Sequence, residues 1–353
     1  MQKDMHYYGT YAMARAAGLE PYACEVIASS AQFVDDHAKT EEINFKDGAR
    51  IDTEATAHHS VDGKNIERKD QRLVWVPFHF LPGNEGESYQ ERMVCRKDSE
   101  IARTMVEHAL SKSDKVYALP LIGITAHVYA DTFSHHGFSG YSSHLNRVNQ
   151  DSIAFDGVEA SIKDYIMGKF SRFIEKFEAE FAEDLSGALG HGSVATYPDR
   201  PYLKWNFEYE SAPDEVVTRT NPVDFLDGCR ALHSMFSKFA DLEPDYKDKS
   251  GGLEFPKIED EVATILSYQA DMQGRIDRWK HSAEGGRLFA ASRGEQIPDY
   301  DEQKMLQQRD SLKGMDDSEI AISNPIYHFY QAAEIHRVFI LRDLLPSFNL
   351  IAH

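Results

Sequence analysis

The chain has 353 residues, of which 42% are hydrophobic, and this is enough to form the core of one large domain or of two. Its formal charge of −20 disfavours a nucleic-acid-binding surface, because neutralising phosphates requires clustered Lys and Arg. Bound cations reverse the sign of the charge locally. An acidic protein with a metal centre can therefore still have a phosphate ester as its substrate.

The first residues, MQKDMHYYGTYAMARAAG, contain no basic stretch followed by an uninterrupted apolar one. No later run reaches the ~18 apolar residues of a membrane span. We therefore expect a soluble, cytoplasmic protein without a transmembrane segment. The three cysteines, Cys24, Cys95 and Cys229, are far apart and form no CxxC pair, which argues against a disulfide framework or a Cys-rich zinc site.

Helical periodicity dominates the chain, and runs of alternating β-branched residues are scarce. A first helix is predicted over 5–17, and a second over 20–38 with Pro21 in its first turn. From 39 to 97 the chain is irregular, and its one strongly apolar piece, RLVWVPFHFLPG, is expected to be extended. Further helices are predicted over 98–112, 114–136, 156–186, 222–241, 257–280 and 325–345.

The segments 187–221 and 242–256 carry Pro, Gly and Asp and are expected to be long loops. Long connections of this kind often line an active site. The prediction is an all-α fold, a multihelical bundle with long irregular connections, in a single domain over 1–353. Its metal-site core would cover about 5–150 and its C-terminal helices about 156–350.

The segment GITAHVYADTFSHHGFSG carries the strongest functional signal. On an α-helix His127, Asp131 and His135 are four residues apart in succession, so each is rotated only ~40° from the one before and all share a face. Apolar flanks predict a buried helix, and buried carboxylates and imidazoles need partners. Two imidazoles and a carboxylate suit Zn²⁺. The alternative is a polar stripe that faces solvent.

Further candidate ligands are scattered along the chain. His6 opens the first predicted helix, and Asp35 and Asp36 close the second. His79 lies inside the apolar PFHFLPG, where a histidine without a partner would be costly to bury. His136 directly follows the helical row.

Taken in order, these residues resemble the zinc-dependent phospholipase C and single-strand nuclease superfamily, an all-helical family with a three-zinc cluster. In that family a histidine opens an early helix, an aspartate ends a Trp-Ala-Asp-like segment, a histidine sits in a Leu-His-Phe-like stretch, and a helix carries His-x-x-x-Asp. The resemblance gives these places to His6, Asp35 after Phe33-Val34, His79 between Phe78 and Phe80, and the pair His127 and Asp131. The helical segment also resembles that of bacterial phospholipase C-like proteins of unassigned role.

The chain departs from the family pattern at two places. The secreted enzymes bind metal through the amino group and carbonyl of an N-terminal tryptophan, whereas residue 1 here is Met. The family also has a histidine about six residues after the helical pair and then a His-x-x-x-acid pair. The chain offers His135 or His136, followed by His144 with Val148 where the acid would fall. His135 follows the helical face and His136 the family spacing, so both stay candidates. One to three Zn²⁺ ions, or another divalent transition metal, are the expected cofactors.

The leading hypothesis is metal-dependent hydrolysis of phosphate esters, above all phospholipid-like or nucleotide-like phosphodiesters, by metal-assisted in-line displacement. The resemblance implies that Asp131 bridges two metals and that Asp35 binds metal and orients the attacking water. The spacing of the family pattern favours Asp35 over Asp36 as the metal ligand. The alternative is a catalytically inactive helical protein that binds a structural metal or acts as an interaction module.

Four other histidines are weaker candidates. His58 and His59 lie in the irregular region and either enter the site or are solvated. His328 and His336 share a face of the last predicted helix, where histidines are more often core or surface residues than ligands.

Overall fold

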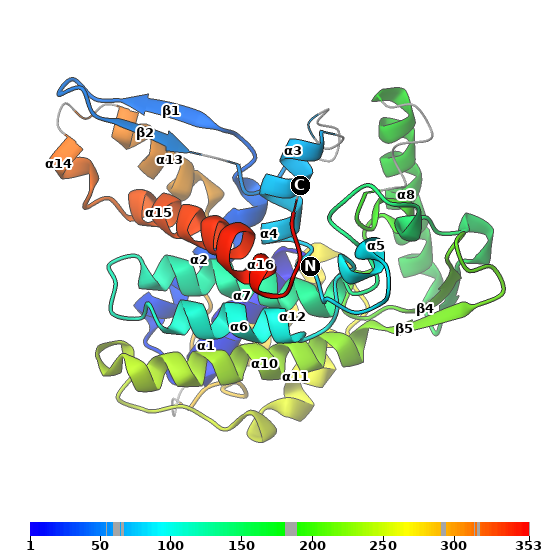
Figure 1. The fold of residues 1–353 in the computed structure, drawn as a ribbon. Helices are drawn as coiled ribbons and strands as arrows, with labels where there is room; N and C mark the ends of the chain where they lie inside the picture. Colours follow the sequence, from blue (N-terminus) through cyan, green and yellow to red (C-terminus); the bar gives the residue numbers. More distant parts are fainter. Residues whose placement is uncertain are drawn as a thin grey trace.

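The computed structural model describes residues 1–53, 55–58, 64, 67–180, 189–290, 294–313, 315 and 318–352. Helices make up most of this structure, and two small antiparallel sheets lie on opposite sides of it (Figure 1). The prediction of an all-α fold is therefore wrong, because one two-stranded and one three-stranded sheet accompany the helices. Within the described ranges, no helix is long and apolar enough to cross a bilayer.

Helix α7 (Ala118–Ser134) is the centre of the fold, and all of its residues are buried. Helices α2 (Pro21–Asp36), α6 (Glu100–Leu110), α10 (Asn221–Leu242) and α15 (Pro325–Val338) pack against it (Figure 1). A helix enclosed in this way must be apolar on nearly every face. The polar residues that α7 does carry are therefore exceptions, and each of them needs a partner.

Helices α2 and α7 approach each other closely at Gly123. A Cβ atom at this position would lie 2.4 Å from the carbonyl oxygen of Ile27 and 2.7 Å from Cβ of Ser30, so a larger residue would push the helices apart. The close approach places the carbonyl oxygen of Ala31 2.8 Å from Nδ1 of His127. Because Gly123 has no side chain, α2 and α7 can pack closely enough for the C-terminal end of α2 to contact the His127 ring.

The N-terminal segment consists of the π-helical turn η1 (Asp4–Gly9) and helix α1 (Thr10–Ala16). The predicted helices over 98–112, 114–136, 222–241 and 325–345 are confirmed, with the bounds given above for α6, α7, α10 and α15. The other α- and π-helical elements are α3 (Arg68–Asp70), η3 (Gln71–Trp75), α4 (Val76–Phe78), α5 (Tyr89–Arg92), α8 (Ala160–Glu180), α11 (Glu259–Leu266), α12 (Met272–Glu284), α13 (Glu302–Lys313), α14 (Ser318–Ala321), η9 (Phe339–Leu344) and α16 (Leu345–Ser347). Short 3-10 turns are η4 (His144–Asn146), η5 (Gln150–Ser152), η6 (Gly192–Val194), η7 (Pro244–Tyr246) and η8 (Phe255–Lys257).

Two predictions need correction. The piece RLVWVPFHFLPG is not extended but begins with η3 and α4, and Pro77 lies in α4 directly after the π-helical turn η3. The single helix predicted over 257–280 is two helices, α11 and α12. Asp271 begins the second one, because its carboxylate accepts a hydrogen bond of 2.9 Å from the amide of Gly274.

The strands lie in segments that were expected to be irregular. Strands β1 (Glu41–Asn44) and β2 (Arg50–Thr53) form a hairpin, and β3 (Ala154–Asp156), β4 (Lys204–Glu208) and β5 (Val216–Thr220) form the second sheet in that order. In β4 buried and more exposed residues alternate, which is the period of a strand with one covered face. This sheet replaces part of the loop predicted over 187–221.

The buried apolar residues form two clusters. The main cluster surrounds α7 and includes Phe78. The second cluster lies against the three-stranded sheet and includes Phe80, Trp205 and Phe207. Since Phe78 belongs to one cluster and Phe80 to the other, His79 lies at the boundary between them.

Helix α15 holds the segment before His79 in place through His336. Nε2 of His336 donates a hydrogen bond of 2.9 Å to the carbonyl oxygen of Pro77, and its ring stacks on that of Phe78 with 5.4 Å between ring centroids. Burial lowers the pKa of His336 from 6.5 to about 4. His336 is thus a neutral core histidine near pH 7.

We expect His336 to make the protein sensitive to acid. Between pH 6.5 and about 4 the unfolded chain binds a proton at this position that the folded protein does not. The free energy of unfolding should therefore fall as the pH is lowered through this window, by about 1.4 kcal/mol per pH unit for this one group. Urea denaturation in excess chelator should show a shallower pH dependence for His336→Gln than for the wild type. The exposed His281→Gln is the control, and equal slopes for His336→Gln and wild type would contradict the assignment.

Candidate metal centre

Three groups of ligand-type side chains meet in the interior around Asp131. In each group, one ligand atom of every residue lies within 4.8 Å of the corresponding atoms of the others. The first group is Asp35, His79 and His127, the second is His135, His191 and Asp199, and the third is His6, His127 and Asp131.

The carboxylate of Asp131 faces more than one group. Its Oδ2 atom lies 3.3 Å from Nε2 of His127 and 3.5 Å from Nδ1 of His79. Its Oδ1 atom lies 3.3 Å from Nε2 of His6. A carboxylate with its two oxygens directed to different ligand groups is suited to bridge two cations.

The amino group of Met1 is buried in the same cluster. It is ion-paired with Oδ1 of Asp131 and lies 3.3 Å from both Oδ1 of Asp199 and Nε2 of His135. Burial alone would lower the pKa of this amine, but Asp131, Asp199 and Asp35 outweigh burial and raise it from 8.0 to about 10. Residue 1 thus places an ammonium group where the second and third groups meet, and this nitrogen can bind a metal only when it loses its proton.

Backbone carbonyl groups fix four of the imidazole rings. A carbonyl oxygen only accepts hydrogen bonds, so the ring nitrogen beside it carries the proton, and the other ring nitrogen keeps its lone pair for the cluster. This arrangement is typical of metal-binding histidines. The pairs are His127 Nδ1 with Ala31 O at 2.8 Å, His79 Nε2 with Thr56 O at 2.8 Å, His135 Nδ1 with His79 O at 2.8 Å, and His191 Nδ1 with Ala195 O at 2.5 Å.

His127 belongs to two groups but can serve only one cation. Its Nδ1 is committed to Ala31, and an imidazole nitrogen offers a single lone pair, which leaves Nε2 for one ion. If His127 joins the first group, the third retains His6 and Asp131. The Met1 amine is then the next nitrogen within reach.

The geometry and the unpaired atoms of the cluster fit a bound metal. Tetrahedral zinc with bonds of ~2.0 to 2.1 Å holds its ligand atoms ~3.3 to 3.4 Å apart. Ligand atoms here are 3.3 Å apart between His127 and His79, and 3.1 Å apart between His135 and Asp199. Neither ring nitrogen of His6 has a hydrogen-bond partner among the described residues. Such buried, unpaired atoms are what a cation would satisfy.

The pKa values support the same arrangement. Burial lowers the pKa of His6 and of His191 to about 4, so both rings are neutral near pH 7, as metal ligands must be. Burial would raise the pKa of Asp131, but His135 and the Met1 amine hold it well below its usual range. Asp131 therefore stays a carboxylate.

Asn221 places Asp199 in the second group. Nδ2 of Asn221 donates hydrogen bonds of 2.8 Å to the carbonyl oxygens of Tyr197 and Arg200, on either side of Asp199. Its Oδ1 accepts a hydrogen bond of 3.2 Å from the indole N–H of Trp205 in β4. The second sheet and its core thus fix the segment that carries this ligand.

His136 lies outside all three groups. Its Nε2 is 3.0 Å from Oδ2 of Asp224, which also pairs with Lys97 at 2.7 Å and with Arg219 at 3.7 Å. Arg219 in turn donates hydrogen bonds to the carbonyl oxygens of Ser134 and His136, at 2.7 and 2.8 Å, and so closes the C-terminal end of α7. Of the two adjacent histidines, the structure directs His135 to the ligand groups and His136 to an ion-paired cluster.

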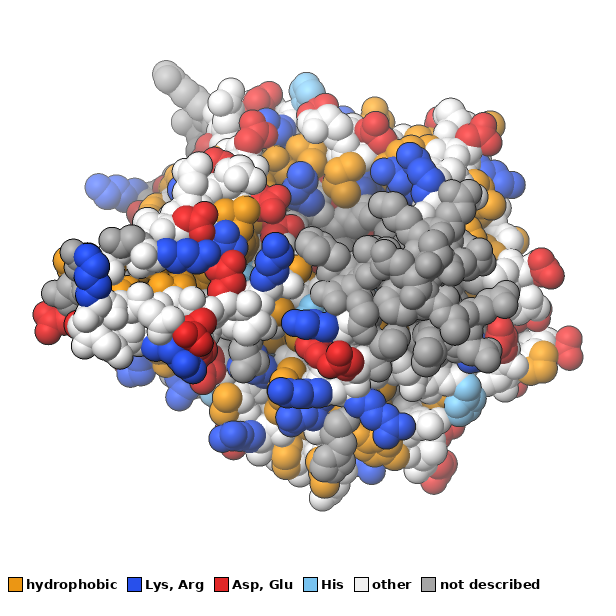
Figure 2. Space-filling model, turned by 90° about the horizontal axis from the view of Figure 1, so that it is seen from above, with side chains coloured by type: hydrophobic (Ala, Val, Ile, Leu, Met, Phe, Trp, Pro, Cys, Tyr) orange, Lys and Arg blue, Asp and Glu red, His pale blue; other side chains and the backbone are white. Residues whose placement is uncertain are grey.

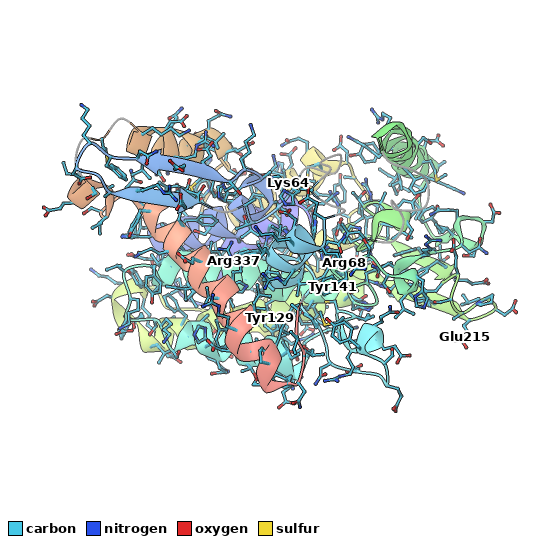
Figure 3. The ribbon with its side chains drawn as sticks, turned by 45° about the horizontal axis from the view of Figure 1, so that its top comes forward. Lys64, Arg68, Tyr129, Tyr141, Glu215 and Arg337 are labelled. Atoms are coloured by element: carbon cyan, nitrogen blue, oxygen red, sulfur yellow. The ribbon has the colours of Figure 1, made fainter. Side chains whose placement is uncertain are left out.

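Asp36 and Tyr129 lie close to candidate ligands in the sequence, but their side chains form hydrogen bonds outside the ligand groups. Asp36 accepts a hydrogen bond of 2.6 Å from the hydroxyl of Tyr300, and burial raises its pKa to about 6. Tyr129, labelled in Figure 3, lies two residues after His127 on α7 and donates its hydroxyl to Asp98 at 2.6 Å. Asp35, and not Asp36, is the residue of this pair in the ligand groups.

The other candidate histidines are not in the groups either. His144 is exposed, and His58 is buried with its Nε2 3.1 Å from Oδ1 of Asp70. His59 lies outside the described residues. Sequence reasoning missed the Met1 amine and the two ligands His191 and Asp199. The family pattern predicted a histidine and then an acid after His135. His191 and Asp199 are eight residues apart, in a segment that was predicted to be a loop.

The fold and the site define a mainly helical protein with a buried cluster of imidazoles, carboxylates and one amine that could hold metal ions. The chain belongs to a family of unknown function, DUF6765, which matches residues 1–344. No curated protein and no solved structure matches it. The matched range contains every residue of the three ligand groups.

His191, which belongs to a ligand group, and His136, which lies outside all three, allow a paired test. We expect His191→Ala to lose about one equivalent of metal, because it removes one of three side chains from the second group. His136→Ala removes a half-buried imidazole outside the groups and should keep the wild-type metal content. Elemental analysis of both variants after dialysis, normalised to folded protein, measures the difference. The same metal content in both variants would remove His191 from the ligand set.

Proposed function

We propose that the protein is a metal-dependent hydrolase of phosphate esters, with phosphodiesters as its main substrates. The observation that carries this proposal is the position of Asp131, whose oxygens face two ligand groups within a cluster that contains a third. A bridging carboxylate is suited to hold two cations close together, and paired cations are a common device for displacement at phosphorus.

The ligand types support zinc as the metal. All three groups offer imidazole nitrogen and carboxylate oxygen, which Zn²⁺ accepts readily. The resemblance to the zinc-dependent phospholipase C and single-strand nuclease superfamily supports three ions. In that reading the Met1 amine takes the place of the N-terminal tryptophan, and His191 with Asp199 takes the place of the late histidine and acid.

The exposure of the ligands indicates the side from which a substrate arrives. The side chain of Asp35 is 32% exposed, whereas that of His191 is 18% and that of Asp131 only 1%. When bound, the cations would activate water and neutralise charge on the phosphate ester. Asp35, the ligand most open to solvent, is the carboxylate best placed to accept a hydrogen bond from that water. Asp131, which is enclosed by the imidazole rings, would bridge two cations and hold them close together.

Basic side chains precede His79 along the chain. On the face seen in Figure 2, Lys and Arg side chains are interspersed with Asp and Glu side chains, although the whole chain has a net charge of −20. Lys64, Arg68 and Arg337 are labelled near the middle of the view in Figure 3, and Arg68 belongs to α3, which leads through η3 and α4 to His79. Positive side chains around the approach to a site raise the local concentration of an anion.

The proposal predicts that Asp131→Asn loses metal and activity together. The substitution removes the charge that both facing cations need, so hydrolysis of a chromogenic phosphodiester by the zinc-loaded protein should fall at least ~100-fold. Asp224→Asn is the matched control, because Asp224 is a buried carboxylate outside the ligand groups. It should keep its metal and most of its activity.

The wild-type protein decides between the two hypotheses on function. It should carry metal after purification without chelator and should turn over a phosphodiester, a phosphomonoester or a phospholipid. Wild-type protein that is fully loaded with metal and hydrolyses none of the three would exclude the hydrolase and support the metal-binding protein without activity.

A further inference from the structure

The third ligand group depends on the first six residues of the chain. His6 lies in η1, whose first turn is closed by hydrogen bonds from the amides of Met5 and His6 to the carbonyl oxygen of Gln2, at 2.8 and 2.9 Å. The residue before this turn, Lys3, makes no side-chain cap. The position of the Met1 amine and of the His6 ring therefore depends on what holds Gln2 and Asp4.

Arg275 of α12 contacts both of these residues. Its Nη2 donates a hydrogen bond of 2.6 Å to the side-chain oxygen of Gln2, and its Nε lies 3.3 Å from Oδ2 of Asp4. The side chains of Arg275 and Asp4 are only 3% and 1% exposed. The guanidinium also lies over the ring of Tyr202, 5.7 Å from its centroid. One side chain thus holds the start of η1 on both sides of Lys3.

Packing alone does not explain a charged pair at this place. Trp279 and Ile276 of α12 are buried in the main core, and a Cβ atom on Gly9 of η1 would lie 3.4 Å from the Trp279 ring. Apolar contact therefore already joins the two helices. A buried ion pair costs desolvation and is often no more stable than apolar residues of the same size. Arg275 adds a fixed orientation of Gln2 and Asp4, because the planar guanidinium holds its partners in a set geometry.

We propose that Arg275 is a positioning residue for the third ligand group, which holds Gln2 and Asp4 so that His6 and the Met1 amine face Asp131. The inference rests on the proposed metal centre. It assigns to Arg275 a role in metal binding and none in contact with the substrate. The first and second groups take none of their side-chain ligands from η1 and should keep their metal.

Metal content and affinity test the inference without an activity assay. Arg275→Met should lose about one of the zinc equivalents of the wild type, or bind it at least ~10-fold more weakly in a chelator titration, and keep the others. Arg278→Met, on the same helix but with a side chain 31% exposed, is the matched control and should keep all of them.

A double variant separates positioning from folding. Asp4→Leu with Arg275→Met replaces the buried pair by apolar side chains, so the metal-free protein should melt no lower than the wild type. It should still lack the same zinc equivalent.

Arg275→Met with the wild-type metal content and affinity would overturn the inference, as would an equal loss of zinc from every group. A wild-type protein that binds no metal would instead overturn the proposed function, so the two failures are distinguishable.

Discussion

A carboxylate in the centre of the protein, that of Asp131, is the constraint on which the site depends. An ionised group in this position is costly unless opposite charge and hydrogen bonds compensate it. Helix α7 delivers the carboxylate, and η1 and the segment after α4 bring His6 and His79 to within 3.5 Å of it. His135, the Met1 amine and His127 supply this compensation and hold the pKa of Asp131 well below its usual range, although burial acts against them. In His127 the effect of burial is outweighed by Asp131 and Asp35, so its pKa is raised. The carboxylates of Asp35 and Asp199 add further negative charge, which a metal ion bound in the ligand groups would offset.

The two apolar clusters explain how ligands so far apart in the sequence meet. The main core holds α2 and α7 together, and Gly123 sets their distance, so Asp35 and His127 come from rigid elements. The second core and its sheet hold the segment around Asp199 through Asn221. His79 lies where the two cores join, and Phe80, the residue after it, stacks on the ring of His135 with 4.7 Å between centroids. A site at such a boundary can draw ligands from both halves of the fold.

The sequence predicts the parts of this site that lie on regular elements. His127 and Asp131 share a helical face by periodicity alone, and Asp35 ends a helix that the apolar pattern identifies. The Met1 amine and the pair His191 and Asp199 could not be found in this way, since they reach the site through tertiary contacts and not through a local period. Apolar runs are equally ambiguous. RLVWVPF fits a buried strand or a buried helix, and β4 is too short for its alternation to stand out from a loop.

The neighbours His135 and His136 show why residue type alone does not mark a metal ligand. Both histidines lie beside a carboxylate, buried His135 beside Asp199 and half-buried His136 beside Asp224. Asp224, however, also has Lys97 and Arg219 as partners. Burial would raise the pKa of Asp224, but His136, together with Lys97 and Arg219, holds it low. Around His135 the described side chains offer no lysine or arginine in an ion pair with Asp131 or Asp199. The supply of Lys and Arg partners, which depends on the fold, therefore separates a structural histidine and aspartate pair from one that is suited to hold a metal.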